Sequence, residues 1–195
     1  MKPLVVQQNI ILNDMQLVLI RHLETPYNKA GLLQGQMDIP ILDPGQLVLN
    51  QIAENKKQLS EMPAFDHILI SKLKRTLMTA QHYGYSEQEL VVEPLLNELS
   101  FGEFEGKTKP ELFDRHGELW KNNPEKLILG EPLTKLQLRI EKLIEKYKNS
   151  KSLLIFGHGS WSRALCSLNK HGHINQMNQM HIPNNELIRI SWNIQ

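Results

Sequence analysis

The segment 15–28 constrains the fold of this chain more than any other stretch. It contains a short apolar run, 17–20, whose β-branched residues are typical of a buried strand. Arg21 and His22 follow directly, and Pro26 has no N–H to donate to a strand ladder, so the strand ends before it. Ligands bind at the carboxyl ends of strands in open α/β sheets. The segment therefore predicts that an arginine and a histidine reach a ligand site.

Apolar runs alternate with helical patterns along the rest of the chain. Strands are expected over 65–70, 90–92, 153–156 and 186–192, and helices over 44–60, 73–83, 133–147 and 160–169. Asp43 followed by Pro44 is typical of a helix start, with Asp43 as N-cap. The alternation predicts an α/β fold: a three-layer α/β/α sandwich with a mostly parallel central sheet and helices on both faces.

The length of 195 residues suits one domain over 1–195. Residues 1–14 precede the first clear strand, and we expect them to form an N-terminal extension. Residues 95–131 are rich in glycine and proline and predict a short helical insertion that caps the site.

Composition restricts the partners that this chain can have. Lysine and arginine total 22 against 21 aspartate and glutamate, so there is no strong positive field for nucleic acid or for a membrane surface. No run approaches the roughly 18 apolar residues of a spanning helix, and we expect a cytoplasmic protein. Any affinity for an anion such as phosphate would therefore have to come from a few well-placed cations.

A second histidine follows a second predicted strand. Gly157, His158 and Gly159 come directly after the run 153–156, and a helix is expected to begin near Ser160. Glycines allow close approach of a ligand to the backbone, and the free N–H groups of a helix N-terminus attract anions. A capping or core histidine is the alternative, but the flanking glycines favour a site for His158.

Other strand ends add a cation and carboxylates. Arg75 follows the strand over 65–70, where it can face the sheet edge or, like Lys72 and Lys74, the solvent. Three glutamates follow the strand over 90–92, namely Glu98, Glu103 and Glu105. Carboxylates in loops are usually solvated, but Glu98 stands between leucines, which can desolvate it and keep it protonated.

Together these segments resemble the histidine phosphatase superfamily, the phosphoglycerate-mutase-like group. The motifs are Arg-His-x-Glu-Thr at 21–25, Leu-Gln-Gly at 33–35 with Asp38 and Pro40 beyond, Ser-x-Leu-x-Arg-Thr-x-x-Thr-Ala at 71–80, Asn-Glu-x-x-Phe-Gly-x-x-Glu-Gly at 97–106, and His-Gly at 158–159. Each motif alone is weak, but together they run in order over nearly the whole chain, which makes the resemblance specific.

The resemblance implies a phosphomonoesterase that acts on a small phosphorylated metabolite through a phosphohistidine. His22 would attack phosphorus, while Arg21, Arg75 and His158 hold the phosphoryl oxygens. Glu98 would protonate the leaving oxygen and then assist water. The implied binding positions are Thr25, Asn28, Gln34, Gly35 and Gly159.

The same resemblance implies no metal or other cofactor. His171, His173 and His181 follow no buried strand and are poor candidates for metal ligands. Aromatic residues of the insertion can select the substrate or can belong to the core; they are Phe104, Phe113 and Trp120, together with His116.

Two departures from the family pattern leave alternatives open. Leu23 stands where the family usually has glycine, and a branched side chain there can narrow the pocket or alter the backbone behind His22. A weakly active module that binds phosphorylated ligands is therefore one alternative. Leu99 follows Glu98 where phosphoglycerate mutases commonly place an arginine, and the insertion is short. These features favour a phosphatase similar to the broad-specificity and α-ribazole phosphatases over a mutase.

Overall fold

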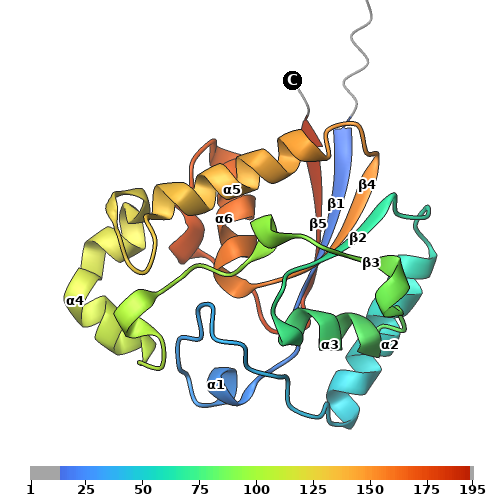
Figure 1. Ribbon diagram of the computed structural model, residues 1–195, viewed down its shortest axis with the longest axis horizontal. Coiled ribbons are helices and arrows are strands. Elements are labelled where there is room, and N and C mark those ends of the chain that lie inside the picture. The colour runs from blue at the N-terminus through green and yellow to red at the C-terminus, as the bar shows by residue number, and fades with distance from the viewer. Residues whose placement is uncertain (1–13, 194–195) are drawn as a thin grey trace, which may run out of the picture.

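A five-stranded mixed sheet forms the centre of the computed structural model, which describes residues 14–193 (Figure 1). The strand order is β3-β2-β4-β1-β5, and only β5 runs antiparallel to its neighbour. The strands are β1 (Asp14–Arg21), β2 (His67–Ile70), β3 (Leu90–Val92), β4 (Ser152–Gly157) and β5 (Leu187–Asn193). The mostly parallel α/β sheet that the sequence predicts is therefore confirmed.

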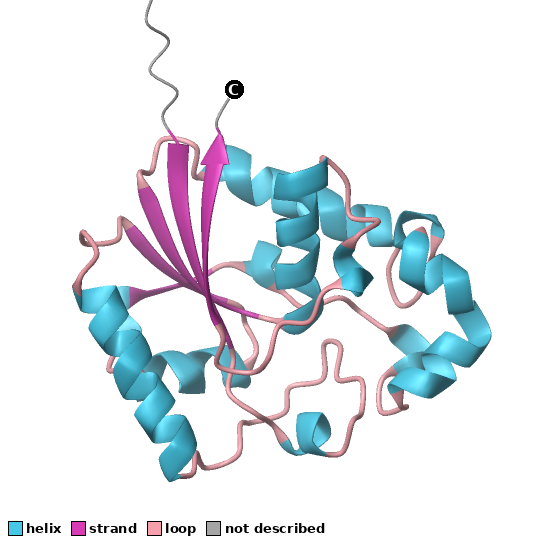
Figure 2. Ribbon diagram, turned by 180° about the vertical axis from the view of Figure 1, so that it is seen from behind, coloured by secondary structure: helices cyan, strands magenta, loops and turns pink. Residues whose placement is uncertain are grey.

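Helices cover both faces of this sheet (Figure 2). Those of the described residues are α1 (Pro26–Lys29), α2 (Gln46–Ser60), α3 (Lys74–His82), α4 (Lys109–Asn122), α5 (Leu133–Lys146) and α6 (Gly159–His171). Short 3₁₀ helices lie at Glu87–Glu89, Pro94–Leu96, Gly102–Phe104, Pro124–Lys126 and Met177–Gln179. Helices α5 and α6 pack on one face, and α2 and α3 pack on the other, which gives three layers.

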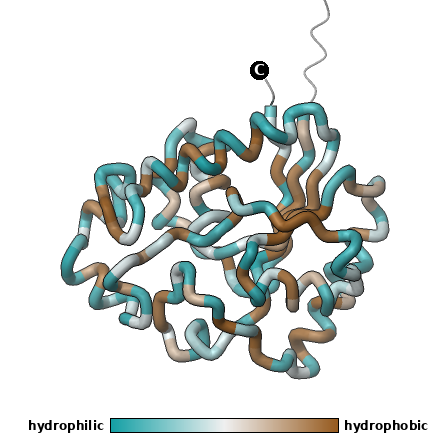
Figure 3. The backbone as a smooth tube through the Cα atoms, viewed as in Figure 1, coloured by the Kyte–Doolittle hydropathy of each residue, from teal (hydrophilic) through white to brown (hydrophobic). Residues whose placement is uncertain are grey.

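Alternation along β1 divides the apolar core between these two faces. Leu17 and Leu19 belong to the cluster that includes α5 and α6, whereas Val18 and Ile20 belong to the cluster that includes α2 and α3. Successive strand side chains point to opposite faces, so a strand covered on both sides reads as a continuous apolar run. The brown centre of the tube in Figure 3 shows the same concentration of apolar residues. The sheet is therefore covered on both faces where it delivers Arg21 and His22.

The register of the parallel strands brings their carboxyl ends to one edge. Arg21 is the partner of Gly157 on β4, and Ile70 of β2 is the partner of Phe156. The His22 N–H donates to the Gly157 carbonyl at 3.0 Å, which extends the ladder by one residue. The residues that follow β1, β2 and β4 must therefore converge.

The insertion packs on the α5–α6 side of the molecule and carries α4. Phe101, Phe104 and Leu112 from it join the same core cluster as α5 and α6. Gly117 interrupts α4 with a φ of 39°, a conformation that glycine adopts without strain. The predicted short helical pieces are confirmed, and they lie beside the sheet edge.

Two expectations about where segments begin and end need correction. Helix α2 begins at Gln46 with Gly45 as its N-cap, not at Pro44 with Asp43 as N-cap, because the chain stays extended through Gly45 (ψ 171°). Asp14 already belongs to β1, and the rest of the predicted extension, residues 1–13, lies outside the described residues. Within 14–193 no helix has both the length and the apolarity to span a bilayer.

Candidate active site

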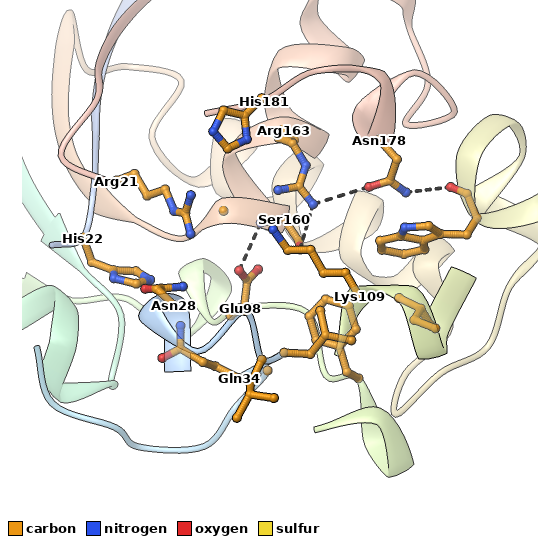
Figure 4. Close-up of a pocket in the computed structure, with 18 of the residues that line it drawn as sticks. Arg21, His22, Asn28, Gln34, Glu98, Lys109, Ser160, Arg163, Asn178 and His181 are labelled. Atoms are coloured by element: carbon orange, nitrogen blue, oxygen red, sulfur yellow. Dashed lines mark hydrogen bonds between the residues drawn. The ribbon is translucent and has the colours of Figure 1, made fainter. Parts of the chain in front are cut away.

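A cavity of about 230 Å³ lies at the carboxyl ends of β1 and β4 (Figure 4). Eight of the residues predicted from the sequence line it: Arg21, His22, Asn28, Gln34, Gly35, Arg75, Glu98 and Gly159. The two others, Thr25 and His158, are fully buried directly behind this lining. The structure therefore brings all ten predicted residues to one place.

His22 is oriented by a hydrogen bond to its own neighbour. Its Nδ1 lies 2.7 Å from the Leu23 carbonyl oxygen, and since a carbonyl only accepts, Nδ1 carries the proton. Nε2 is then the free nitrogen of a ring that lines the cavity. Burial, followed by the charges of Arg75 and Arg21, holds the pKa of His22 well below 6.5. The ring is therefore neutral at neutral pH, with a lone pair available for attack.

Arg21 is the first cation beside this nitrogen. Its Nη1 donates to the Ile182 carbonyl at 2.5 Å, and its side chain packs over Gly159, where no Cβ intervenes. Within residues 14–193 the buried Nε–H has no protein acceptor. Burial lowers the pKa of Arg21 to about 10, so the guanidinium remains charged at neutral pH. An anion in the cavity would therefore satisfy both the charge and this donor.

Arg75, which the sequence left between two environments, faces the cavity. It is fully buried, whereas Lys72 and Lys74 of the same segment are exposed. Its Nη1 and Nη2 donate to the carbonyls of Met37 and Gly35 at 2.7 and 2.8 Å. Each of these nitrogens carries a second N–H. Arg75 therefore holds the loop of Gly35 and still has donors for a ligand.

His158 adjoins His22 but is engaged by the protein on both ring nitrogens. Its Nδ1 accepts from Nε of Arg75 at 3.2 Å, so the proton resides on Nε2, which donates to Ser71 Oγ at 2.7 Å. Its ring meets that of His22 edge-on, with centroids 5.4 Å apart. Burial and the charge of Arg75 hold its pKa well below 6.5. In this arrangement His158 orients Arg75, and direct contact with a phosphoryl oxygen stays a prediction.

Two side-chain amides present donors to the cavity. Oδ1 of Asn28 accepts from the Thr25 N–H, which completes the capping box of α1, so Nδ2 remains as the outward group. Oε1 of Gln34 accepts from Thr25 Oγ1 at 2.8 Å, which leaves its Nε2 as donor. Thr25 thus acts behind the cavity lining, where it fixes which end of each amide faces a ligand.

Glu98 occupies the N-terminus of α6. Its Oε1 accepts from the N–H groups of Leu99 and Trp161, and its Oε2 accepts from the Ser160 N–H, at 2.9 to 3.0 Å. The sequence predicted an anion at this helix N-terminus, and the structure supplies it as a carboxylate of the protein itself. The expected apolar setting is therefore replaced by a polar one, and the protonated state of Glu98 stays a prediction.

The other two candidate acids lie elsewhere. Glu103 is exposed and pairs with Arg115 at 2.8 Å. Oε1 of Glu105 accepts from the N–H groups of Gln36 and Phe101 and occupies the place where a Cβ on Gly35 would fall. Glu105 therefore ties the Gly35 loop to the insertion, and Gly35 is needed for that close approach.

Leu23, the departure from the family pattern, does not narrow the cavity. Its side chain is buried in the core cluster of α2 and α3, and its N–H donates to Thr79 Oγ1 at 2.9 Å. Among the described non-glycine residues only Asn185 has a positive φ, so Leu23 adopts an ordinary backbone conformation. The two effects considered from the sequence, a smaller pocket and an altered backbone, are both absent.

Sequence reasoning missed the more exposed side of the cavity. This outer wall consists of Lys109, Arg163, Asn178 and His181 (Figure 4) together with Trp120. Of these, only Trp120 was a specificity candidate. Arg163 donates weakly to Ser160 Oγ and Asn178 Oδ1, at 3.3 and 3.4 Å. Arg163 stands four residues after Gly159 on one helix face, and that spacing is a signal that could have identified it.

The outer wall carries cations without carboxylate partners. In the part of the chain that the structure describes, neither Lys109 nor Arg163 forms an ion pair. Burial lowers the pKa of both, and the charge of Arg163 lowers that of Lys109 further. The remaining specificity candidates lie away from the cavity: Phe104 packs in the core against His116, and Phe113 is exposed.

The described residues form no grouping of three or more histidine, cysteine, aspartate or glutamate side chains suited to a metal ion. His171 and His173 stack on each other with ring centroids 6.1 Å apart. His181 belongs to the outer wall instead.

Comparison with known proteins gives a consistent family. Residues 17–195 match the family model described as histidine phosphatase superfamily, branch 1. A Hydrogenobacter thermophilus protein provisionally named phosphoserine phosphatase 2 is 30% identical over 163 residues, which are 78% of this chain and 77% of that protein. A 2,3-bisphosphoglycerate-dependent phosphoglycerate mutase of Bartonella tribocorum is 31% identical, over 76% of this chain and 78% of the mutase.

Solved structures agree with this assignment. The α-ribazole phosphatase of Shigella flexneri superposes with a TM-score of 0.70 at 25% identity and covers 90% of this chain and 89% of that one. A mycobacterial glucosyl-3-phosphoglycerate phosphatase, solved with VO₃, has the same fold, with a TM-score of 0.71 at 21% identity; the match covers 93% of this chain and 100% of that one.

Proposed function

The chain belongs to the histidine phosphatase superfamily, whose members are phosphatases and mutases, and on that premise we propose that it is a metal-independent phosphomonoesterase with a phosphohistidine intermediate. The observation that carries the proposal is the state of the His22 ring. Its Nδ1 is committed to the Leu23 carbonyl and its pKa is lowered, so a neutral Nε2 stands at the cavity beside Arg21 and Arg75.

In the first step Nε2 of His22 attacks phosphorus and the P–O bond to the alcohol breaks. Glu98 gives the leaving oxygen its proton, while Arg21 and Arg75 stabilise the charge on the phosphoryl oxygens. The amide donors of Asn28 and Gln34 add neutral hydrogen bonds to the same group. Phosphoryl transfer asks mainly for this kind of positioning and charge stabilisation.

In the second step water attacks the phosphoryl group and the P–N bond breaks. Glu98, now ionised, takes the proton of the water, and the electron pair of the P–N bond returns to Nε2. Hydrolysis of monoesters requires up to ~10²¹-fold acceleration, of which one general acid supplies about 10²–10⁴. The covalent intermediate and the arginines must provide most of the remainder.

The direct test is hydrolysis of p-nitrophenyl phosphate in excess chelator. We expect activity to persist and His22→Ala to lower kcat by about 10⁴-fold or more, since the nucleophile is gone. His82→Ala, which removes an exposed histidine at the end of α3, is the matched control. Activity that disappears with chelator, or that survives in His22→Ala, would contradict the proposal.

One observation favours a second candidate, phosphoglycerate-mutase-type phosphoryl transfer. Lys109 and Arg163 supply unpaired cations that can hold a second anionic group of a substrate, such as a carboxylate. The similarity to the Bartonella mutase supports the same candidate. The cavity volume and this charge also favour a small phosphate ester with a second anionic group as substrate of the phosphatase.

The two candidates differ in where the phosphoryl group goes. With 3-phosphoglycerate and a bisphosphoglycerate primer, a phosphatase releases inorganic phosphate faster than it forms 2-phosphoglycerate. Faster formation of 2-phosphoglycerate would establish the mutase and reject hydrolysis as the main activity. Binding of both ligands with neither product would leave the third function, a binding module.

A further inference from the structure

We propose that Asn184 is a positioning residue for this reaction that acts through the amide of Asn28, while the main-chain carbonyl of His22 fixes the orientation of Asn184 itself. The proposal rests on the proposed function, because it assigns Asn184 a part in the same phosphoryl transfer. Asn184 is half-buried in the segment that leads into β5 and does not line the cavity. It therefore acts on the ligand only through other residues.

The contacts of Asn184 join two residues of the site. Its Nδ2 donates to the His22 carbonyl oxygen at 2.8 Å and to Oδ1 of Asn28 at 3.2 Å. A backbone carbonyl accepts and never donates, so the His22 carbonyl determines which end of the Asn184 amide faces it. The same Nδ2 then requires oxygen, not nitrogen, at the facing position of Asn28.

This chain of donors fixes the functional end of Asn28. Oδ1 of Asn28 already accepts from the Thr25 N–H at 3.2 Å, and Asn184 adds a second donor to that oxygen. If Asn28 were flipped, its NH₂ group would oppose two donors. Thr25 and Asn184 thus hold the Asn28 amide from two sides, so that its Nδ2 faces the cavity, where it can donate to a phosphoryl oxygen.

A buried polar cluster holds Asn184 in turn. The adjacent Asn185 is buried in a left-handed conformation, with a φ of 63°. Its Oδ1 accepts from the Tyr83 hydroxyl at 2.7 Å, and its carbonyl accepts from Asn55 at 3.0 Å. These bonds hold the segment against α2 and the C-cap of α3. Because a buried network of this kind is fully satisfied, it fixes one arrangement of the segment.

The same segment also fixes Arg21. The Asn185 N–H donates to the Arg21 carbonyl at 3.0 Å, and the Ile182 carbonyl accepts from the Arg21 guanidinium. One short stretch, 182–186, thus controls the side chain of Arg21, the main chain of His22 and the amide of Asn28. The side chain of Asn184 is half-buried and lies outside the buried cluster, so it can be removed without opening that cluster.

The test compares Asn184→Ala and Asn184→Asp with Asn50→Ala, which removes an exposed asparagine of α2. We expect Asn184→Ala to lower kcat for p-nitrophenyl phosphate about tenfold, which corresponds to the 1.4 kcal/mol of a tenfold change, with KM altered less than threefold. Asn184→Asp should lose more, because it sets a carboxylate against two acceptors. Asn50→Ala should match the parent protein.

The readout that separates positioning from stability is a double-mutant cycle with Asn28→Ala. If Asn184 acts through Asn28, Asn184→Ala should cost at most threefold in kcat once that amide is absent. Equal losses in both backgrounds, or a lowered melting temperature with kcat unchanged, would overturn the proposal.

Binding of vanadate, which mimics a phosphoryl group in transfer, keeps this test separate from that of the proposed function. We expect vanadate to bind the parent protein about tenfold more tightly than it binds Asn184→Ala, with the same non-additivity in the Asn28→Ala background. A parent protein that binds vanadate without hydrolysing any phosphate ester would reject the proposed function only. Equal vanadate affinity in the parent and Asn184→Ala would reject the positioning role only, and a parent protein that binds no vanadate would contradict both.

Discussion

The inner and outer walls of the cavity are built in different ways. The inner wall consists of Arg21, His22, Arg75 and Gly159, which lie at the end of a strand or in the first turn of the helix that follows one. The side chains of Arg21, His22 and Arg75 are held by hydrogen bonds of 2.5 to 3.2 Å. The outer wall comes from α4, α6 and the segment after it, and its arginine has only contacts of 3.3 and 3.4 Å. Chemistry that needs fixed geometry belongs to the inner wall, and recognition of the rest of the substrate belongs to the outer wall.

The largest effect that sharpens this comparison is expected for Glu98→Gln, which removes the general acid from between the walls. For an alkyl phosphate, whose leaving oxygen needs a proton, kcat should fall about 10²–10⁴-fold. For p-nitrophenyl phosphate, the phenolate leaves without a proton. The rate constant of the first step, phosphoryl transfer to His22, should therefore fall far less with this ester. Steady-state and rapid-quench measurements on both esters check this, and equal losses in the first step would contradict the role of Glu98 as acid.

Arg21→Met tests the inner wall without touching the nucleophile. Loss of one fixed cation that stabilises developing charge should lower kcat about 10²–10³-fold for every ester. The expected pattern is a uniform loss, because the phosphoryl group is common to all substrates. A loss restricted to substrates with a second anionic group would instead place Arg21 in the outer wall.

Arg163→Met gives the complementary result for the outer wall. For a phosphate ester with a carboxylate, KM should rise about tenfold, since a charge-assisted hydrogen bond contributes roughly 1.5–3 kcal/mol. For p-nitrophenyl phosphate the change should be less than threefold. Arg189→Met, an exposed arginine on β5, serves as control. A similar loss on both substrates would assign Arg163 to the phosphoryl site.

The last effect concerns stability in acid rather than catalysis. Burial lowers the pKa of His22 and His158 below the 6.5 of an unfolded histidine, so below pH 6.5 the unfolded chain binds more protons than the folded one. The free energy of unfolding should therefore decrease as the pH is lowered below 6.5, by up to about 1.4 kcal/mol per pH unit for each histidine. Denaturant titrations between about pH 5 and 6.5 measure this slope.

One variant behind the inner wall and one in the outer wall separate the two regions in that experiment. His158→Gln should lower the slope of unfolding free energy against pH, because it removes one buried neutral ring that takes up a proton only on unfolding. Asn178→Ala, which removes a side chain of the outer wall that carries no titratable group, should leave the slope unchanged. An unchanged slope in His158→Gln would show that this ring is not buried neutral in the folded protein.

The inner wall could be predicted because parallel strands align their carboxyl ends. Once 17–20 and 153–156 are identified as strands, Arg21 and His158 must lie near each other, and the register of β1 with β4 confirms it. Arg75 was decided only by tertiary packing, since its helix offers both a buried and a solvated face.

The rest of the site depends on contacts between distant segments. The carboxylate of Glu98 lies on the N-terminus of α6, 62 and 63 residues further along the chain, so no local pattern reveals it. Lys109 begins α4, whose place beside the sheet follows from packing of the insertion. For Leu23 the sequence suggested an effect on the site that the structure does not show. Although the family usually has glycine at this position, the Leu23 side chain is buried in the core cluster of α2 and α3.

The central claim is that His22 carries the phosphoryl group, and rapid-quench trapping tests it most directly. The protein is mixed with a phosphate ester, quenched in alkali, where phosphohistidine survives, and its peptides are analysed by mass spectrometry. We predict a phosphoryl group on the peptide that contains His22, formed at least as fast as product is released and labile in acid. A phosphoryl group on another residue, or turnover faster than His22 becomes labelled, would contradict it.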